Sequence, residues 1–215
     1  MKAGFKEILL KSSLEVGLLL PEATVRQFEL YYKELLEWNA KISLTTITEP
    51  ADAAIKHFLD SILPLKYVPL AGALIDIGTG AGFPGIPLKI MNPELSVVLV
   101  EVVRKKANFL RQIIRLLNLE GIEVYNGRIE DFDRPAAFDY AVSRAFSELG
   151  MFCRLAEPYI KSGGALLAMK GTDAKEHAAA HEMAARGLAC TAIQTYELPL
   201  NKGRRSLIIM QKCFT

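Results

Sequence analysis

Residues 74–85 read LIDIGTGAGFPG, a short apolar run that ends in a glycine-rich turn. An apolar run of this kind, Ala73–Ile77, predicts a buried strand, and the residues after Pro84 have helical spacing. Glycine allows positive φ and a close approach of the backbone to a ligand. In open α/β sheets, ligands bind where strands end in such turns. The stretch therefore predicts both an α/β fold and a binding site.

The rest of the chain continues this alternation of short apolar runs and longer helical patterns. Strands are predicted at Ala73–Ile77, Val97–Val100, Ile122–Tyr125, Tyr140–Ser143 and Ala165–Met169, and near 188–197 and 206–211. Helices are predicted at Gly85–Met91, Arg104–Leu117, Leu149–Ile160 and Asp173–Arg186. Buried strands that alternate with helices predict a doubly wound, mostly parallel sheet of seven strands.

The two ends of the chain depart from this alternation. Residues 199–203 are too few for a helical crossover, so one of the last two strands is predicted to run antiparallel. Helical spacing of apolar residues at 22–40 and 51–63 predicts helices in the first third. We therefore expect a helical extension over residues 1–68 and an α/β domain over 69–215.

Composition excludes several classes of protein. The chain has 215 residues, 51% of them hydrophobic, and a formal net charge of +2, which is typical of a globular domain. This near-neutral balance argues against a polybasic nucleic-acid coat. The three cysteines lack metal spacing, and His177 and His181 lack the HExxH context, so no metal is expected. Without a signal peptide or a long apolar span, we expect a cytoplasmic protein with no membrane partner, and a monomer.

Two acids near the glycine turn indicate which ligand it binds. Gly80–Gly85 match the GxGxxG pattern of dinucleotide sites, but the strand ends near Ile77, so the first loop glycine is Gly78 and the sixth position is Phe83. Asp76 would repel a pyrophosphate and suits a ligand that carries an amino group. Glu101 ends the next strand, where a carboxylate accepts ribose hydroxyls. The pattern favours S-adenosylmethionine over NAD, with Asp76, Gly78, Gly80 and Glu101 as contacts.

Later strand ends add further candidates. Arg128-Ile129-Glu130-Asp131 follows the third strand, where an adenine ring would lie, although Asp131 serves equally well as a helix cap. Ser143-Arg144-Ala145 ends the fourth strand, and an arginine after so apolar a run favours a site role.

The methyl acceptor is indicated by missing motifs and by basic residues. No Asp/Asn-Pro-Pro-aromatic run grips an exocyclic amine, and no Pro-Cys activates a pyrimidine. N7 of guanine has a lone pair and no proton, so it needs neither device, and alignment alone can promote its methylation. Basic residues in two clusters suggest contacts with RNA phosphates, although the helix positions among them also suit solvated faces. These residues are Arg104, Lys105, Lys106, Arg111 and Arg115, and Lys170, Lys202, Arg204, Arg205 and Lys212.

Several stretches resemble the bacterial ribosomal RNA small subunit methyltransferase G family, also called glucose-inhibited division protein B. They are WNAK (38–41), LT (44–45), HFLDS (57–61), DIGTGAGFPGIP (76–87), KKANFL (105–110), RIE (128–130), SRA (143–145), KG (170–171) and RR (204–205). The resemblance runs from about residue 25 to the end. Ser43 and Arg205 depart from the residues usual in that family.

The resemblance implies a class I, Rossmann-like methyltransferase with an N-terminal helical extension. It also implies methylation of N7 of guanine 527 in 16S rRNA, either naked or within the 30S subunit or a precursor. The cofactor contacts that it implies are Gly78, Phe83, Ile129, Glu130 and Arg144. Arg144 and Lys170 are expected to position the acceptor without a general base, and Lys105, Arg204 and Arg205 to hold RNA. The alternatives are a small-molecule or other RNA methyltransferase, and a non-catalytic nucleotide-binding regulator.

Overall fold

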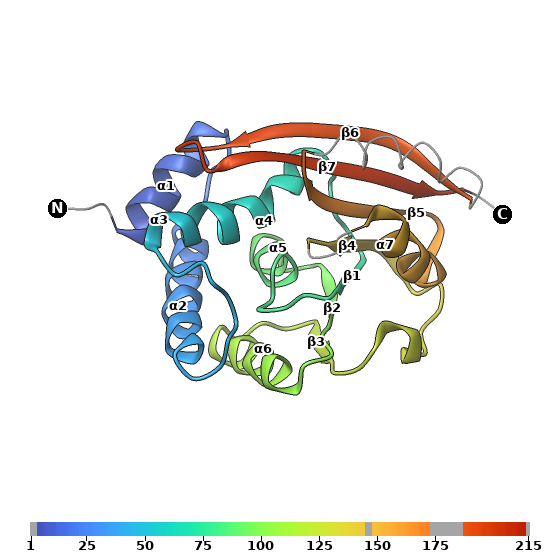
Figure 1. Cartoon of the computed structure of the whole chain (residues 1–215), viewed down its shortest axis with the longest axis horizontal. Coiled ribbons are helices and arrows are strands. Elements are labelled where there is room, and N and C mark those ends of the chain that lie inside the picture. The colour runs from blue at the N-terminus through green and yellow to red at the C-terminus, as the bar shows by residue number, and fades with distance from the viewer. Residues whose placement is uncertain (1–3, 145–147, 173–186, 214–215) are drawn as a thin grey trace.

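A seven-stranded sheet forms the centre of the molecule (Figure 1). The structure is a computed structural model, and it describes residues 4–144, 148–172 and 187–213. Along the sheet the strand order is β3-β2-β1-β4-β5-β7-β6. The strands are β1 (Ala73–Ile77), β2 (Ser96–Val100), β3 (Ile122–Tyr125), β4 (Phe138–Ser143), β5 (Ile160–Gly171), β6 (Leu188–Leu198) and β7 (Gly203–Lys212).

Strand direction confirms the prediction from the short final connection. The first five strands pair in parallel, whereas β7 is antiparallel to both β5 and β6. As a result β7 begins at the edge of the sheet where the parallel strands end, with Arg205 opposite Gly171 and Ser206 opposite Lys170. The antiparallel strand therefore brings its first residues to the edge that follows the glycine turn.

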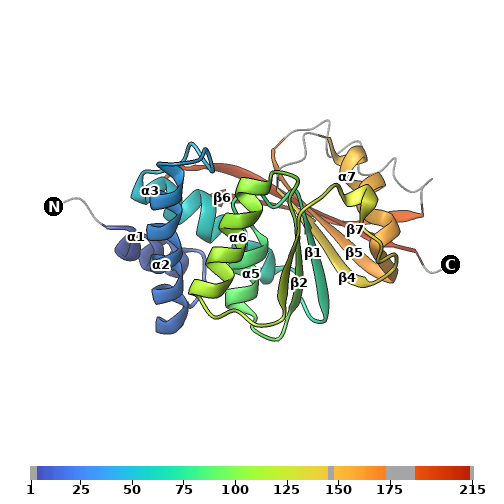
Figure 2. The ribbon, with the colours of Figure 1, turned by 90° about the horizontal axis from the view of Figure 1, so that it is seen from below.

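Helices cover both faces of the sheet (Figure 2). One face carries α5 (Gly85–Met91) and α6 (Arg104–Leu116) together with the N-terminal helices, and the other carries α7 (Leu149–Ala156). Alternate residues of β1 enter the two cores, because successive strand side chains point to opposite faces: Leu74 belongs to the first and Ile75 to the second. Burial on both faces explains why β1 and β2, in the middle of the parallel part, consist mainly of apolar residues.

The N-terminal third is helical, as predicted. It contains α1 (Phe5–Glu15) and α2 (Glu22–Asn39), followed by a helical stretch from Pro50 to Lys66. That stretch is irregular: α3 (Pro50–Asp52) leads into a π-helical segment (Ala53–Leu59), α4 (Asp60–Ile62) and a 3-10 turn (Leu63–Lys66). π-Helical segments within helices are frequent at functional sites.

One hydrophobic core joins the N-terminal helices to the sheet. Phe28 of α2 and Phe58 of the π-helical segment lie in the same buried cluster as Leu74 of β1 and Phe109 of α6. The boundary expected between residues 68 and 69 stays a prediction, since this packing runs across it.

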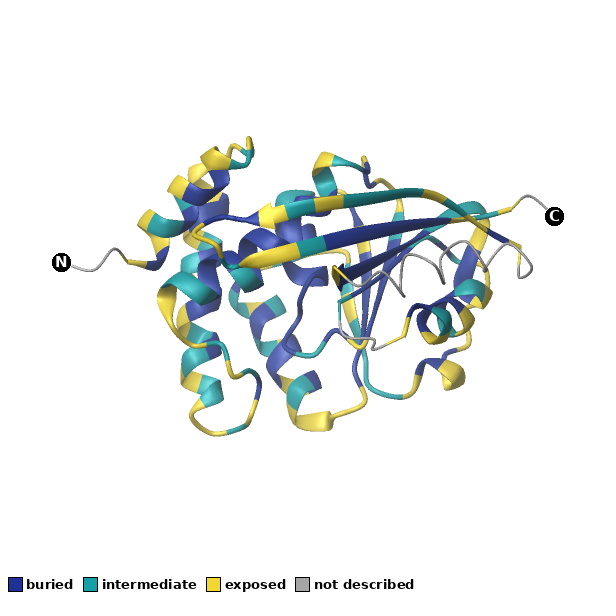
Figure 3. Ribbon diagram, turned by 45° about the horizontal axis from the view of Figure 1, so that its top comes forward, coloured by how far each residue is buried: buried dark blue, intermediate teal, exposed yellow. Residues whose placement is uncertain are grey.

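The hairpin of β6 and β7 extends from the sheet over the N-terminal helices (Figure 3). The Lys202 ammonium lies 3.0 Å from the Asp52 carboxylate of α3, and the Tyr196 ring stacks at 6.2 Å on Tyr67. The middle of β7 is buried, whereas β6 is the edge strand and is mostly half-buried or exposed.

One predicted helix is shorter in the structure than expected, and another lies outside the described residues. The helix expected over Leu149–Ile160 ends at Ala156, because Pro158 lies in a 3-10 turn (Glu157–Tyr159) and Ile160 already begins β5. The helix expected over Asp173–Arg186, with His177 and His181, lies outside the described residues, as does Ala145.

The described ranges contain neither a helix suited to cross a membrane nor a cluster suited to hold a metal ion. No helix there combines the length and apolarity that crossing a bilayer requires. Over the same residues, no cluster of three or more His, Cys, Asp or Glu side chains is arranged to hold a metal ion.

Candidate cofactor and acceptor site

The predicted site residues gather along one edge of the sheet. Gly78 follows β1, Glu101 follows β2, and Arg144 follows β4. Chain order reverses between β1 and β4, and open α/β sheets bind ligands at such a switch point. The glycine turn therefore lies where the sequence placed it.

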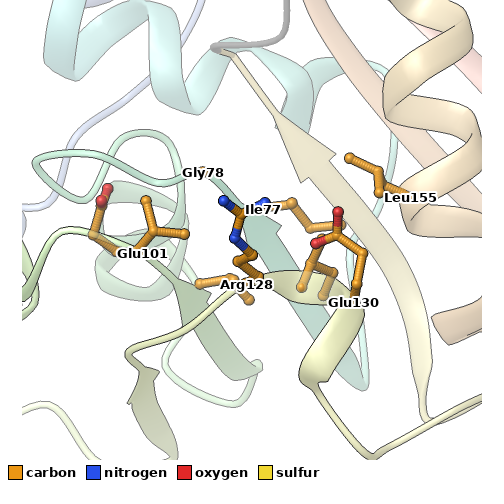
Figure 4. Close-up of a pocket in the computed structure, with 9 residues that line it drawn as sticks. Ile77, Gly78, Glu101, Arg128, Glu130 and Leu155 are labelled. Carbon is orange, nitrogen blue, oxygen red and sulfur yellow. The ribbon is translucent and has the colours of Figure 1, made fainter.

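A cavity of about 320 Å³ opens beside the glycine turn, and we call it the cofactor cavity. Its walls combine apolar side chains with three charged ones, and Figure 4 shows Glu101 and Glu130 flanking Arg128. It is lined by Ile77, Gly78, Val100, Glu101, Val102, Arg128, Ile129, Glu130 and Leu155. Four of the predicted cofactor contacts, Gly78, Glu101, Ile129 and Glu130, thus meet at one cavity.

Glu101 also fixes the glycine turn to the end of β2. One carboxylate oxygen accepts the Gly80 N–H at 3.0 Å, and the other accepts the Val103 N–H at 2.8 Å. A carboxylate has about four acceptor positions, so both oxygens retain capacity toward the cavity.

Asp76 lies beneath the turn and does not line the cofactor cavity. Its Oδ2 accepts the Thr79 hydroxyl at 2.6 Å and the Gly85 N–H at 2.8 Å, while Oδ1 has no partner in the described part of the chain. Burial raises the pKa of Asp76 to about 6. The carboxylate holds the turn closed from below, and its contact with a cofactor stays a prediction.

The glycines of the turn serve two different needs. A Cβ at Gly82 would lie 2.4 Å from the Tyr31 hydroxyl and 2.6 Å from Ile86, so this position is glycine because the protein fills the space. Gly80 has φ of +62°, yet a Cβ there would meet nothing within 4 Å. Open space at Gly80 is what a ligand resting on the turn requires.

Three stacked rings support the turn from the N-terminal side. The Phe83 ring lies between Tyr31 of α2, at 5.2 Å, and His57 of the π-helical segment, at 4.5 Å. The Tyr31 hydroxyl donates to the Ala81 carbonyl, and burial raises the pKa of Tyr31 well above its usual value, so it remains a donor. Phe83, a predicted cofactor contact, is buried in this stack and does not line the cofactor cavity.

Arg144 is held over the same stack. Its guanidinium carbon lies 5.2 Å from the Phe83 ring centre, and its two terminal nitrogens donate to the Lys56 carbonyl at 2.8 Å and to Nδ1 of His57 at 3.1 Å. Burial first, and then the charges of Arg144 and Lys56, lower the pKa of His57 to about 3. His57 is therefore neutral at physiological pH and accepts from Arg144, so Nε2 carries the proton that Thr45 accepts at 2.8 Å.

A second cavity, of about 270 Å³, lies along the same edge at the ends of β5 and β7, and we call it the basic cavity. Arg144, Lys170 and Arg205 all line it, and the contact of Arg144 and Lys170 with an acceptor stays a prediction. Lys105 and Arg204 are exposed, on α6 and β7. The described lining consists of Ile47, Lys56, His57, Asp60, Arg144, Met169, Lys170, Gly171 and Arg205.

Several residues of the N-terminal third belong to the site but were not placed there from sequence, and three of them are polar side chains of particular interest. Tyr31 supports the glycine turn, whereas His57 and Asp60 line the basic cavity. The available signal was that His57 and Asp60 flank the apolar pair Phe58-Leu59, and the structure shows that both titratable residues are buried.

Comparisons with known proteins agree with this geometry. The family model described as rRNA small subunit methyltransferase G matches residues 24–207. The chain belongs to this family. A protein of that name from Geobacter sp. (strain M21) is 41% identical over 95% of this chain and 96% of its own length. Another from Geotalea uraniireducens (strain Rf4) is 40% identical over 99% of each.

The fold also matches a solved structure. A SAM-dependent methyltransferase from Aquifex aeolicus aligns with a TM-score of 0.57 over 75% of this chain and 93% of that one. At 18% identity it supports the fold alone. As a member of the methyltransferase G family, the chain is an enzyme with a class I, Rossmann-like fold, and its cofactor is S-adenosylmethionine. The apolar cavity, its two carboxylates and the open space at Gly80 fit that molecule.

Proposed function

We propose that this chain transfers a methyl group from S-adenosylmethionine to N7 of a guanine in 16S rRNA, guanine 527 of the decoding-region loop. The observation that carries the proposal is the pair of cavities on one edge of the sheet. The cofactor cavity lies at the ends of β1, β2 and β3, and the basic cavity lies at the ends of β4 and β5 and the start of β7. Family membership supplies the substrate class.

The chemistry requires alignment rather than proton transfer. S-adenosylmethionine supplies an electrophilic methyl group on a sulfonium. With the cofactor bound, the N7 lone pair would form a bond to the methyl carbon while the carbon–sulfur bond broke, and no proton would be released because N7 carries none. The contribution of the protein is to hold the acceptor in line. Since both nitrogens of neutral His57 are engaged by Thr45 and Arg144, His57 does not act as a general base.

Basic side chains around the edge would hold the RNA. Arg204 and Lys105 are exposed and are proposed to contact phosphates, while Arg205 and Lys170 extend this charge into the basic cavity. The first turn of α6 carries Arg104, Lys105 and Lys106 and no acid. Cations are unfavourable at a helix N-terminus, so these residues do not serve helix stability. We propose that the enzyme acts in the cytoplasm as a monomer.

Methyl transfer from labelled cofactor tests the proposal. Naked 16S rRNA, 30S subunits, a 30S precursor and tRNA are offered in parallel, and the modified base is mapped. We expect label at N7 of one guanine in 16S rRNA and none in tRNA. Label confined to tRNA, or to small molecules, would establish one of the alternative methyltransferase activities instead.

Arg144 has a specific test. We expect Arg144→Ala to lower transfer at least about a hundredfold while the protein remains folded, because the acceptor loses its alignment. Arg134→Ala is the matched control, since Arg134 also lies over a phenylalanine ring, at 5.4 Å from Phe132, but lines neither cavity. Wild-type activity in both Arg144→Ala and Arg134→Ala would show that Arg144 does not position the acceptor.

A further inference from the structure

The basic cavity contains one carboxylate among its described lining residues. Lys56, Arg144, Lys170 and Arg205 contribute positive charge, and Asp60, the first residue of α4, contributes the negative charge. The four cations suit phosphates, so the carboxylate needs a separate explanation.

Asp60 is buried but weakly bonded. Its side chain is 3% exposed, and from the described residues its two oxygens accept only long hydrogen bonds, at 3.3 Å from the Tyr196 hydroxyl and 3.4 Å from Nε of Arg205. Hydrogen bonds between charged partners in proteins are usually about 2.7–2.9 Å. Since a carboxylate has about four acceptor positions, Asp60 retains acceptor capacity at the wall of the cavity.

The reaction restricts how guanine can be recognised. Proteins most often recognise guanine with an arginine or lysine that donates to both O6 and N7. That contact would occupy the nitrogen that receives the methyl group, so guanine must be recognised elsewhere. The Watson–Crick edge lies across the ring from N7 and presents two adjacent donors, N1–H and the 2-amino group. Two adjacent donors need two adjacent acceptors, which a carboxylate supplies.

We propose that Asp60 selects guanine by accepting N1–H and the 2-amino group of the target base in the basic cavity. This inference rests on the proposed function, and it adds the residue that sets base specificity. A base that is hydrogen-bonded at its Watson–Crick edge has N7 on its opposite side, where N7 remains free to accept the methyl group. Adenine is disfavoured because its N1 is an acceptor and would face the carboxylate.

The test compares guanine with inosine at the target position of the RNA. Inosine keeps N1–H and N7 but lacks the 2-amino group. We expect the wild-type enzyme to favour guanine over inosine by about tenfold or more in kcat/KM, the effect of losing one hydrogen bond to a charged group. For Asp60→Asn this ratio falls below twofold, because the amide presents a donor where the carboxylate presented an acceptor.

Asp52→Asn is the matched control. Asp52 pairs with Lys56 at 2.9 Å and with Lys202 at 3.0 Å, so it also ties the hairpin to the helices, but it does not line the cavity. D52N should keep the wild-type ratio. A purely structural role of Asp60 would lower transfer to both RNAs equally and leave the ratio of D60N at the wild-type value, which would overturn the proposal.

The wild type decides the remaining cases. If D60N transfers no methyl group, the guanine-to-inosine ratio of kcat/KM is measured with D60A. A ratio below twofold then supports the proposal, and the wild-type ratio overturns it. If that variant is inactive too, a wild-type ratio below twofold overturns the proposal and one of tenfold or more supports it. Failure of the proposed function gives a different result, namely that wild-type enzyme methylates no guanine in 16S rRNA.

Discussion

At the scale of single residues, Tyr31 connects the first long helix to the cofactor turn. Its ring stacks on Phe83 and its hydroxyl donates to the Ala81 carbonyl, within the turn itself. The side chain is fully buried, so the hydroxyl has no water to replace that bond. The shape of the turn thus depends on a residue more than forty positions earlier in the sequence.

Removing this hydroxyl should weaken cofactor binding. We expect Tyr31→Phe to raise the KM for S-adenosylmethionine several-fold and to lower the free energy of unfolding by about 1 kcal/mol, because a buried carbonyl loses its donor. Steady-state kinetics and urea unfolding measure the two effects. Tyr32→Phe is the control: Tyr32 donates to the Thr48 carbonyl at 2.6 Å, away from the turn, so stability should fall with KM unchanged. Equal KM values in both variants would contradict this role.

Asp76 predicts a particular pH dependence of stability. Its pKa is about 6 in the folded protein, above its ordinary value of 3.8, so between these values the folded state binds more protons than the unfolded state. Stability contributed by this group therefore falls as pH rises from 4 to 7. Relative to Asp76→Asn, the wild type should lose about 2 kcal/mol of unfolding free energy across that range.

Asp139 provides a control of opposite sign. Burial opposes its ionisation, but hydrogen bonds from Lys161 and the Ala73 N–H prevail, and the pKa of Asp139 is lowered. Relative to Asp139→Asn, the wild type should gain stability as pH rises from below that lowered pKa toward neutrality. Denaturant unfolding at several pH values measures both differences, and parallel curves for wild type and D76N would refute the prediction for Asp76.

Sequence could locate some of these residues and not others. Gly78 and Glu101 were predicted because each directly follows a strand, and parallel strands end at one edge. Ile129 and Glu130, in the 3-10 turn after β3, were predicted from the family resemblance. The roles of His57 and Asp60 depend on how the helical stretch from Pro50 to Lys66 packs against strands far away in the sequence. No local pattern encodes that packing.

At the scale of elements, the glycine turn contains a position where glycine is required for its backbone conformation and not for close packing. Gly80 and Gly17 both have positive φ, +62° and +75°, and a Cβ at either would meet nothing within 4 Å. Alanine should cost about 1 kcal/mol of stability at each position, since both adopt the left-handed conformation.

This pair isolates the effect on cofactor binding. Gly80→Ala should weaken binding of S-adenosylmethionine about tenfold or more, measured by calorimetry, because the methyl group occupies the space left for the ligand. Gly17→Ala lies outside the cofactor cavity and should bind normally. Normal binding by G80A would mean that the cofactor does not rest on this glycine.

Elements were predicted best where burial and periodicity agree. β1, α5 and β3 begin and end at the predicted residues. The predicted helix over Leu149–Ile160 was too long, since its apolar spacing continues into β5 past the 3-10 turn at Pro158. The π-helical segment was not predicted, because its backbone register is set by contacts between distant residues.

At the scale of the whole molecule, the N-terminal helices and the sheet share one core. Phe28, Phe58 and Leu35 are fully buried against residues of β1, β2 and α6. We propose that residues 1–68 precede the α/β domain in sequence but fold together with it as one unit. The α/β domain then does not fold without them.

Expression of residues 69–215 alone tests this proposal. We expect no cooperative thermal transition, because removal of the helices exposes the apolar face that they cover. Far-UV circular dichroism of this fragment and of the full chain makes the comparison. A cooperative transition in the fragment would show that the boundary near residue 68 separates an independently folding domain.

The hairpin of β6 and β7 has a consequence for the order in which a newly made chain becomes competent. Translation supplies residues from the N-terminus onward, and the wall residues of the cofactor cavity are complete once Leu155 has been made. The lining residues of the basic cavity are complete only once Arg205 has been made. All lining residues of the methyl-donor site are therefore synthesised before the lining of the proposed RNA site is complete, and β7 supplies the last of the latter.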